Sequence, residues 1–213
     1  PIQGASGFVT PTNKFLQKVR KKCNETGAIL IFDEIQTCFG RLGTLFGFEK
    51  FDVIPDILCI AKGMGAGMPI GAFISSRELM NLLTFKPQLG HITTFGGHPV
   101  SCAASLACLR YLLTSKIMTE IDKKEQLFTE HLKHSKIKGI RGRGLMLAIE
   151  FEDEFLAKKV VEKCLEQGLI LFYFLFTKTT IRITPPLTIS ENEIIKGCNI
   201  ILKSVEKLKE ERI

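Results

Sequence analysis

The chain has 213 residues, of which 45% are hydrophobic and 24% charged, the composition of a globular protein with one domain or two small ones. No apolar run approaches the ~20 residues of a membrane-spanning helix, and the first residues lack a basic-then-apolar signal, so no membrane partner is expected. The net charge of +7 would suit nucleic acid. However, the lysines and arginines are spread along the chain with glutamates among them, so solvated helix faces explain them better.

The seven cysteines include no CxxC pair, and most lie in apolar segments, as reduced and buried thiols do. This pattern favours a reducing cytoplasm over a secreted disulfide scaffold or a zinc site, and no metal is expected. The chain begins at Pro1 without an initiator methionine. We therefore expect a processed or truncated chain, or a piece of a longer one.

The first half alternates between helical and strand patterns. The elements expected there are a helix over 13–26 closed by Gly27, a strand over 28–33, a long loop over 36–55, a strand over 57–62, a glycine-rich turn over 63–69, a strand over 70–74, a helix over 76–83 and a loop over 84–99.

The second half has a different character. The elements expected there are a tightly packed helix over 100–113, a more charged helix over 116–134, a turn and a strand within 139–151, a helix over 155–167, strands over 169–176 and 180–184, and an amphipathic helix that ends near residue 209. Ser190 and Glu193 form a capping box at the start of this last helix. An α/β first part and an antiparallel-looking second part divide the chain into residues 1–115 and 116–213.

Two apolar runs of the first half each end in a charged residue. Ala28-Ile-Leu-Ile-Phe32 is followed by Asp33, and Ile57-Leu-Cys-Ile-Ala61 by Lys62 and the glycine-rich turn. Such runs are typical of strands buried on both faces of a parallel sheet, and polar residues at the carboxyl ends of these strands face the ligand crevice. Asp33 and Lys62 could therefore point into one pocket. The alternative is that Asp33 caps a turn and Lys62 is solvated.

A lysine paired with an acid suits one cofactor especially well. Lysine can hold pyridoxal phosphate as a Schiff base, while a carboxylate keeps the ring nitrogen protonated. The strings FDEIQTCFGR, PDILCIAKGMGAGMPIGAF and TTFGGHPVSCAA resemble the class III pyridoxal-phosphate aminotransferases, the family of the ornithine, acetylornithine and 4-aminobutyrate enzymes. The resemblance implies an α/β, fold-type-I transferase. Residues 1–115 would be the later part of its large, mostly parallel-sheet cofactor domain, and 116–213 its carboxyl-terminal α+β small domain.

The resemblance also implies roles for individual residues. Lys62 would form the Schiff base and, once freed, move the proton between substrate and cofactor. Asp33 would pair with the pyridine nitrogen, Ile35 would pack on the ring, and Gln36 would form a hydrogen bond with the ring oxygen. Without the resemblance, Gln36 would be interpreted as an exposed loop residue.

Thr94 aligns with a family threonine that binds the cofactor phosphate from the opposite subunit, which would make the active protein at least a homodimer. Ordinary turn chemistry is the alternative, and Thr93 is an adjacent rival. Arg182 alternates within an apolar strand and matches the family arginine that binds a substrate carboxylate. An internal salt bridge to Glu or Asp is the alternative for Arg182.

The predicted reaction is ping-pong transfer of an amino group from an amino-acid or ω-amino donor, ornithine- or acetylornithine-like, to a 2-oxo acid such as 2-oxoglutarate. The alternatives are a 4-aminobutyrate-type enzyme, a racemase, aminomutase or decarboxylase of the same class, and an inactive fragment that acts only as an interaction module. The resemblance covers the later part of a family member and lacks the helix start that cradles the phosphate. The isolated chain is therefore expected to bind the cofactor poorly. Departures from the family pattern at Cys38, Ile92, His98 and the aromatic segment 172–176 concern the substrate more than the cofactor.

Overall fold

The computed structural model describes residues 1–86, 88 and 90–210. The chain groups into two compact units. The first unit consists of Pro1 and residues 11–40 and 44–116, and the second consists of residues 2–10, 41–43 and 117–213. Within the described residues, no helix is long and apolar enough to cross a membrane. The division of the whole protein into domains at residue 115 stays a prediction.

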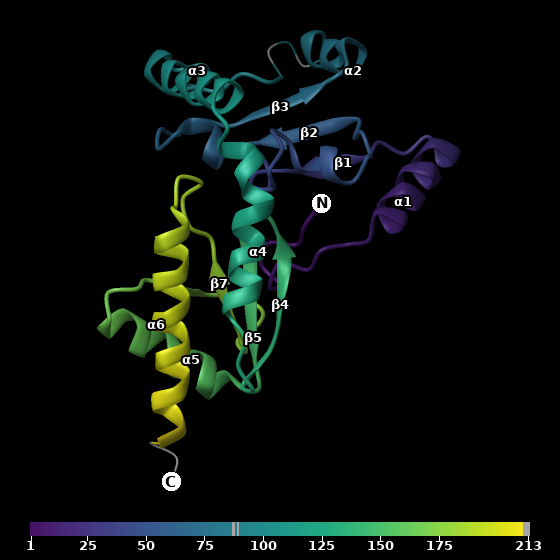
Figure 1. Ribbon diagram of the computed structural model, residues 1–213. Helices are drawn as coiled ribbons and strands as arrows, with labels where there is room; N and C mark the ends of the chain where they lie inside the picture. The colour runs from purple at the N-terminus through teal and green to yellow at the C-terminus, as the bar shows by residue number, and fades with distance from the viewer. Residues whose placement is uncertain (87, 89, 211–213) are drawn as a thin grey trace. The chain divides into compact units, whose positions relative to one another are not determined.

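The first unit is built on a three-stranded sheet with the order β1-β2-β3, whose strands lie side by side in Figure 1. β1 and β2 are parallel, as predicted, and β3 is antiparallel to β2. Its main elements are α1 (Asn13–Thr26), β1 (Ile31–Asp33), β2 (Ile57–Ile60), the short 3-10 helix η2 (Lys62–Gly65), β3 (Ala72–Ser75), α2 (Arg77–Asn81) and α3 (Pro99–Thr114). Short 3-10 helices also cover Gly47–Lys50 (η1) and Leu82–Thr84 (η3).

The expected burial of β1 and β2 on both faces is not found in this chain. Along β1, Phe32 is buried whereas Ile31 is 55% exposed, and burial also alternates along β2. An alternating pattern means that one face of the sheet packs on the unit's core while the other is open. The apolar runs therefore predicted strands correctly but not the covering of both faces.

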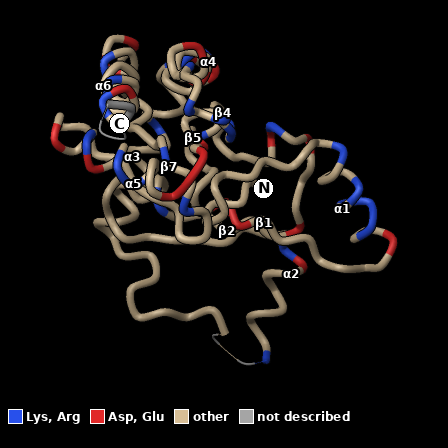
Figure 2. The backbone as a smooth tube through the Cα atoms, turned by 90° about the horizontal axis from the view of Figure 1, so that it is seen from below, with Lys and Arg blue, Asp and Glu red and all other residues tan. Residues whose placement is uncertain are grey.

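The basic helix α1 exposes most of its polar side chains and buries one apolar residue. Thr12 caps its start, Gly27 ends it with a left-handed backbone at φ 71°, and Leu16 is its buried residue. Lysines and arginines gather along this helix (Figure 2), and Lys14 and Lys18 are exposed.

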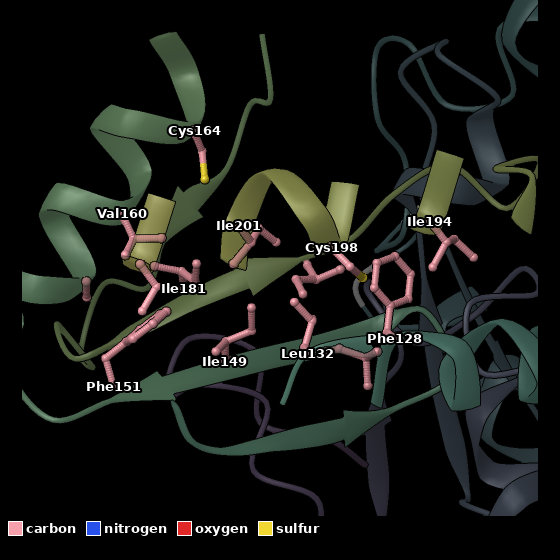
Figure 3. Close-up of a cluster of buried hydrophobic side chains, with 14 of the residues drawn as sticks. Phe128, Leu132, Ile149, Phe151, Val160, Cys164, Ile181, Ile194, Cys198 and Ile201 are labelled. Carbon is pink, nitrogen blue, oxygen red and sulfur yellow. The ribbon is translucent and has the colours of Figure 1, made fainter. Parts of the chain in front are cut away.

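The second unit is built on an antiparallel four-stranded sheet with the order β4-β5-β7-β6. Its elements are η4 (Ile117–Glu120), α4 (Ile121–His131), β4 (Ile137–Arg143), β5 (Met146–Phe151), α5 (Glu154–Glu166), β6 (Phe172–Tyr173), β7 (Thr180–Ile183) and α6 (Glu191–Glu210). One face of the sheet packs on the helices. Figure 3 shows the core side chains, among them Ile149 of β5, Ile181 of β7, Val160 of α5 and Ile201 of α6.

The second unit differs from the sequence-based predictions in two of its strands and agrees with the predicted start of its last helix. The stretch 139–151 is a hairpin of two strands, so placing Arg141 and Arg143 in a turn was wrong: they lie in β4, and the turn falls at Gly144, whose φ is 61°. The strand expected over 169–176 shrinks to β6, because only Phe172 and Tyr173 pair with β7. The capping box is confirmed, since Ser190 and Glu193 exchange hydrogen bonds at the start of α6.

Candidate functional site

The carboxyl ends of β1 and β2 meet at one edge of the three-stranded sheet. Asp33 stands opposite Cys59 in the parallel register, and the Glu34 amide donates to the Cys59 carbonyl at 2.9 Å. Lys62 opens the turn that follows β2 directly. Because parallel strands deliver their carboxyl ends to the same edge, Asp33 and Lys62 both belong to this edge of the first unit.

Asp33 caps a turn and still has a free acceptor. Its Oδ1 accepts a hydrogen bond from the Ile35 amide at 3.0 Å. No other described residue donates to the carboxylate, and the side chain is exposed. The turn-capping alternative is therefore real, but it uses only one of the two carboxylate oxygens and leaves Oδ2 open to a ligand.

Lys62 has an unusual backbone. Its φ is 46°, in the left-handed region that residues with a side chain rarely adopt. Its side chain is exposed, and no carboxylate among the described residues pairs with its ammonium group. Strained backbone positions of this kind cost about 1–3 kcal/mol and concentrate at functional sites. Lys62, which the sequence singled out, is thus one of five residues other than glycine with a positive φ in the described part of the chain.

The turn that carries Lys62 is crowded. A Cβ at Gly63 would lie 3.2 Å from the Cβ of Phe39, tighter than nine in ten real Cβ contacts, so glycine fits there best. Two thiols hold the neighbouring peptides: Cys38 Sγ donates to the Ala61 carbonyl at 3.8 Å, and Cys108 Sγ to the Gly63 carbonyl at 3.5 Å. α3, which carries Cys108, packs on this turn. The segment after β1 and helix α3 thus fix the turn from two sides.

Burial keeps these thiols protonated. It raises the pKa of Cys38 to about 11, and it also raises the pKa of Cys108. A protonated thiol is a weak hydrogen-bond donor and a poor nucleophile. All seven cysteines are unpaired. The two thiols beside Lys62 therefore support the backbone and are not poised to react.

Gln36 carries an unused polar atom. Its Oε1 is buried and has no hydrogen-bond partner among the described residues. Buried side-chain oxygens are normally paired, so an orphaned amide is unusual for a loop residue of purely structural role. Ile35, next to it, is half-buried. Both residues follow Asp33 at the sheet edge that also carries Lys62.

Thr94 lies in an exposed loop beside a cavity of about 440 Å³. Thr93, Thr94, Gly96 and Gly97 line this cavity on one side and Gly71 on the other. The Thr93 carbonyl accepts from the Gly96 amide at 3.4 Å, so this part of the loop is also an ordinary turn. Both threonines remain candidates, and part of the preceding loop, residues 87 and 89, lies outside the described residues.

In the second unit, Arg182 stands in β7 without a polar partner. Its Nε is buried and unpaired, and no described residue accepts a hydrogen bond from its guanidinium or forms an ion pair with it. Burial lowers its pKa from the usual arginine value. Its guanidinium carbon instead lies over two rings, 4.8 Å from the centroid of Phe174 and 5.5 Å from that of Phe8. The salt-bridge alternative is not found among the described residues.

Two comparisons place this geometry among known proteins. The model of the class-III aminotransferase family matches residues 1–205. The chain belongs to this family. Among solved structures, ornithine aminotransferase from Toxoplasma gondii is 34% identical, with a TM-score of 0.90, over 100% of this chain and 50% of that one. Ornithine δ-aminotransferase from Plasmodium falciparum is 31% identical, with a TM-score of 0.89, over 99% and 56%.

A transaminase from the marine bacterium Virgibacillus is also similar, with 27% identity and a TM-score of 0.92 over 100% of this chain and 53% of that one. The chain thus spans about half the length of the solved structures that it matches. These matches confirm the predicted fold, that of the fold-type-I pyridoxal-phosphate-dependent transferases. The Toxoplasma structure holds pyridoxal phosphate at partial occupancy.

The residues of this class III chain fit such a cofactor. The orphaned amide of Gln36, the open Oδ2 of Asp33 and the unpaired amine of Lys62 are three polar groups without partners of their own at one sheet edge. A protonated ring nitrogen would donate to Asp33 Oδ2, a ring hydroxyl would donate to Gln36 Oε1, and an aldehyde carbon would take the Lys62 amine. The fit concerns the first unit alone, to which these residues belong.

Sequence reasoning missed three residues that shape these sites. Glu34 is fully buried, and its carboxylate accepts hydrogen bonds from the amides of Gly47 and Phe48 and from the Thr37 hydroxyl. Arg41 donates to the carbonyls of Leu145 and Pro185 in the second unit, and Phe8 contacts Arg182 there. Apart from Thr37, their partners are distant in sequence, so no local pattern could have identified their roles.

Proposed function

We propose that the chain is part of a pyridoxal-phosphate-dependent aminotransferase that moves an amino group between an amino-acid or ω-amino donor and a 2-oxo acid such as 2-oxoglutarate. The observation that carries the proposal is the strained, unpaired Lys62 at the strand edge that also bears Asp33 and Gln36. Family membership supports the same reaction.

Each residue has a separate task in this proposal. When bound, pyridoxal phosphate supplies an electron sink for the electron pair of the substrate C–H bond that breaks. Asp33 Oδ2 would accept from the ring N–H and keep that nitrogen charged, Gln36 would bind the ring oxygen, and Ile35 would pack on the ring. The Lys62 Nζ would hold the cofactor at its aldehyde carbon. The same amine would serve as the base that takes the proton from the substrate carbon bearing the transferred amino group.

The proposal includes a second subunit. Thr94 binds the cofactor phosphate of a partner copy, so the active protein is a homodimer or larger. Its hydroxyl lies in an exposed loop beside a cavity, where a phosphate could approach. Arg182 binds the substrate carboxylate. The cytoplasm is the proposed location, because seven unpaired thiols suit a reducing compartment.

Ornithine-like donors are the first candidates, because two ornithine aminotransferases are 31–34% identical to this chain. Other amine donors are the second, because an amine transaminase from an uncultivated Pseudomonas species is 27% identical. The rivals of the same class, namely racemases, aminomutases and decarboxylases, differ in needing no amino acceptor.

The test is a pair of half-reactions on the full-length protein loaded with pyridoxal phosphate. An aminotransferase loses its visible cofactor absorption when ornithine is added and regains it when 2-oxoglutarate follows. A Lys62→Ala variant shows no such cycle, whereas the control Lys14→Ala, at an exposed position on α1, behaves as wild type. Turnover of the donor without any need for a 2-oxo acid would contradict the proposal.

A further inference from the structure

Two arginines share one face of the four-stranded sheet in the second unit. Ala148 of β5 stands opposite Arg141 of β4 on one side and opposite Arg182 of β7 on the other. Residues directly opposite each other share a face, and neighbouring strands lie about 4.8 Å apart. The Cα atoms of the two arginines therefore lie in one row across the sheet, about 10 Å apart. The core residues Ile149 and Ile181 lie on the other face, against the helices.

Arg141 uses the polar partners of this face. Its Nε donates to the Gly7 carbonyl at 2.5 Å, its guanidinium forms an ion pair with Glu150, and it also donates to the Thr180 hydroxyl at 3.3 Å. Glu150 is the carboxylate that shares this face, and its partner is Arg141 rather than Arg182. The second guanidinium therefore keeps its hydrogen-bonding capacity.

Two aromatic rings, instead of a carboxylate, contact the guanidinium of Arg182. The rings of Phe8 and Phe174 meet edge to face, with centroids 4.7 Å apart and an angle of 87° between their planes. Both side chains are buried, at 1% and 4% exposure, and both rings lie under the guanidinium carbon of Arg182. A guanidinium held through ring faces keeps its N–H groups free, because the cation–π contact uses none of them.

The position of Phe8 is fixed by its own segment. Phe8 has a left-handed backbone at φ 54°, and Gly7 before it has φ 89°. A bridge between Gln3 and Val9 closes this turn, and the bond from Arg141 to the Gly7 carbonyl ties it to the sheet. A strained residue persists only where its surroundings over-determine it. The ring is therefore placed by the fold and not by chance packing.

We propose that Phe8 and Phe174 are specificity-determining positioning residues for Arg182. They orient the guanidinium without neutralising it, so that it selects ligands with a planar carboxylate over neutral ones. The proposal rests on the substrate role proposed above for Arg182 and adds what makes that arginine selective. A carboxylate supplies the acceptors that the unpaired guanidinium lacks, whereas a neutral group leaves a partly desolvated charge unmatched.

The experiment uses the full-length, cofactor-loaded protein and compares leucine variants of three phenylalanines. Phe8→Leu and Phe174→Leu remove a ring but keep most of the apolar volume. Phe176→Leu is the matched control, because Phe176 belongs to the same segment, is 77% exposed and makes no ring contact with Arg182. Calorimetry measures the Kd for glutarate, an unreactive dicarboxylate, and kinetics measure kcat and KM with 2-oxoglutarate as the varied substrate.

We expect Phe8→Leu and Phe174→Leu each to raise the glutarate Kd and the 2-oxoglutarate KM about tenfold, the worth of a partly desolvated cation–π contact. The kcat stays within about twofold, because the rings act on binding. Phe174→Tyr, which keeps the ring face, restores wild-type values, and thermal unfolding of each variant confirms that it is folded. Equal KM and Kd values for Phe174→Leu and Phe176→Leu would overturn the proposal, as would a loss confined to kcat.

The outcomes also separate this proposal from the proposed function. If the wild type exchanges no amino group with any 2-oxo acid, the aminotransferase reaction fails, but the glutarate affinities still test the aromatic pair. If the wild type exchanges amino groups and the leucine variants match the control, the aromatic pair fails alone.

Discussion

Replacing Glu34 by alanine tests how the loop after β1 is held. The Glu34 side chain is fully buried, and its carboxylate accepts from the amides of Gly47 and Phe48 and from the hydroxyl of Thr37. Alanine leaves two backbone N–H groups without an acceptor, at about 1–3 kcal/mol each. Release of a buried charge offsets part of this cost, because burial raises the pKa of Glu34. We expect a net loss of about 3 kcal/mol.

The assay is amide hydrogen exchange on the full-length protein, read at the peptides that contain Gly47 and Phe48. A loss of about 3 kcal/mol corresponds to exchange roughly a hundredfold faster, since about 1.4 kcal/mol is a factor of ten. Glu49→Ala is the matched control, because Glu49 caps the same 3-10 helix through the Phe46 amide but is exposed. Equal exchange in the two variants would refute the idea that the buried carboxylate holds this loop.

Three further predictions follow from the same contacts. The native pKa of Glu34 is raised above its unfolded value of about 4.3, so the wild type loses stability as pH rises through the native pKa. Glu34→Gln lacks this titration, so denaturant unfolding should show the free energy of unfolding of the wild type increasing relative to that of the variant as pH falls. A constant difference between the two proteins at all pH values would contradict the shift. Cys38, with a pKa of about 11, should be alkylated by iodoacetamide far more slowly at neutral pH than the exposed Cys102, as peptide mapping would measure; equal rates would contradict its burial. Gly63→Val should displace the Lys62 turn and weaken pyridoxal-phosphate binding more than tenfold in fluorescence titrations. Gly139→Val is the control, because a Cβ there meets open space. Unchanged affinity in both variants would contradict the idea that the Lys62 turn has no room for a side chain at residue 63.

The sequence predicted those parts of the structure that depend on neighbours along the chain. The apolar runs ending in Asp33 and Lys62 became parallel strands with a common edge, and Gly27 and Ser190 marked helix ends through local hydrogen bonds. Local signals also identified Lys62, although its left-handed backbone could not be foreseen, because it depends on contacts from the segment after β1 and from α3.

The features that the sequence did not predict depend on distant partners. β4 was missed because its glycines and arginines resemble a turn until it pairs along the length of β5. The buried role of Glu34 depends on amides 13 and 14 residues away, and the aromatic support of Arg182 comes from Phe8 at the other end of the chain. Such contacts leave no periodic or local trace, so only the folded structure reveals them.

The central claim is that Lys62 holds pyridoxal phosphate, and covalent trapping tests it most directly. The full-length protein is incubated with pyridoxal phosphate, reduced with borohydride, digested and mapped by mass spectrometry. We expect one stable pyridoxyl group, located on Lys62, and none there in a Lys62→Ala variant. A protein that takes up no cofactor, or that carries it on another lysine while Lys62 stays unmodified, would contradict the claim.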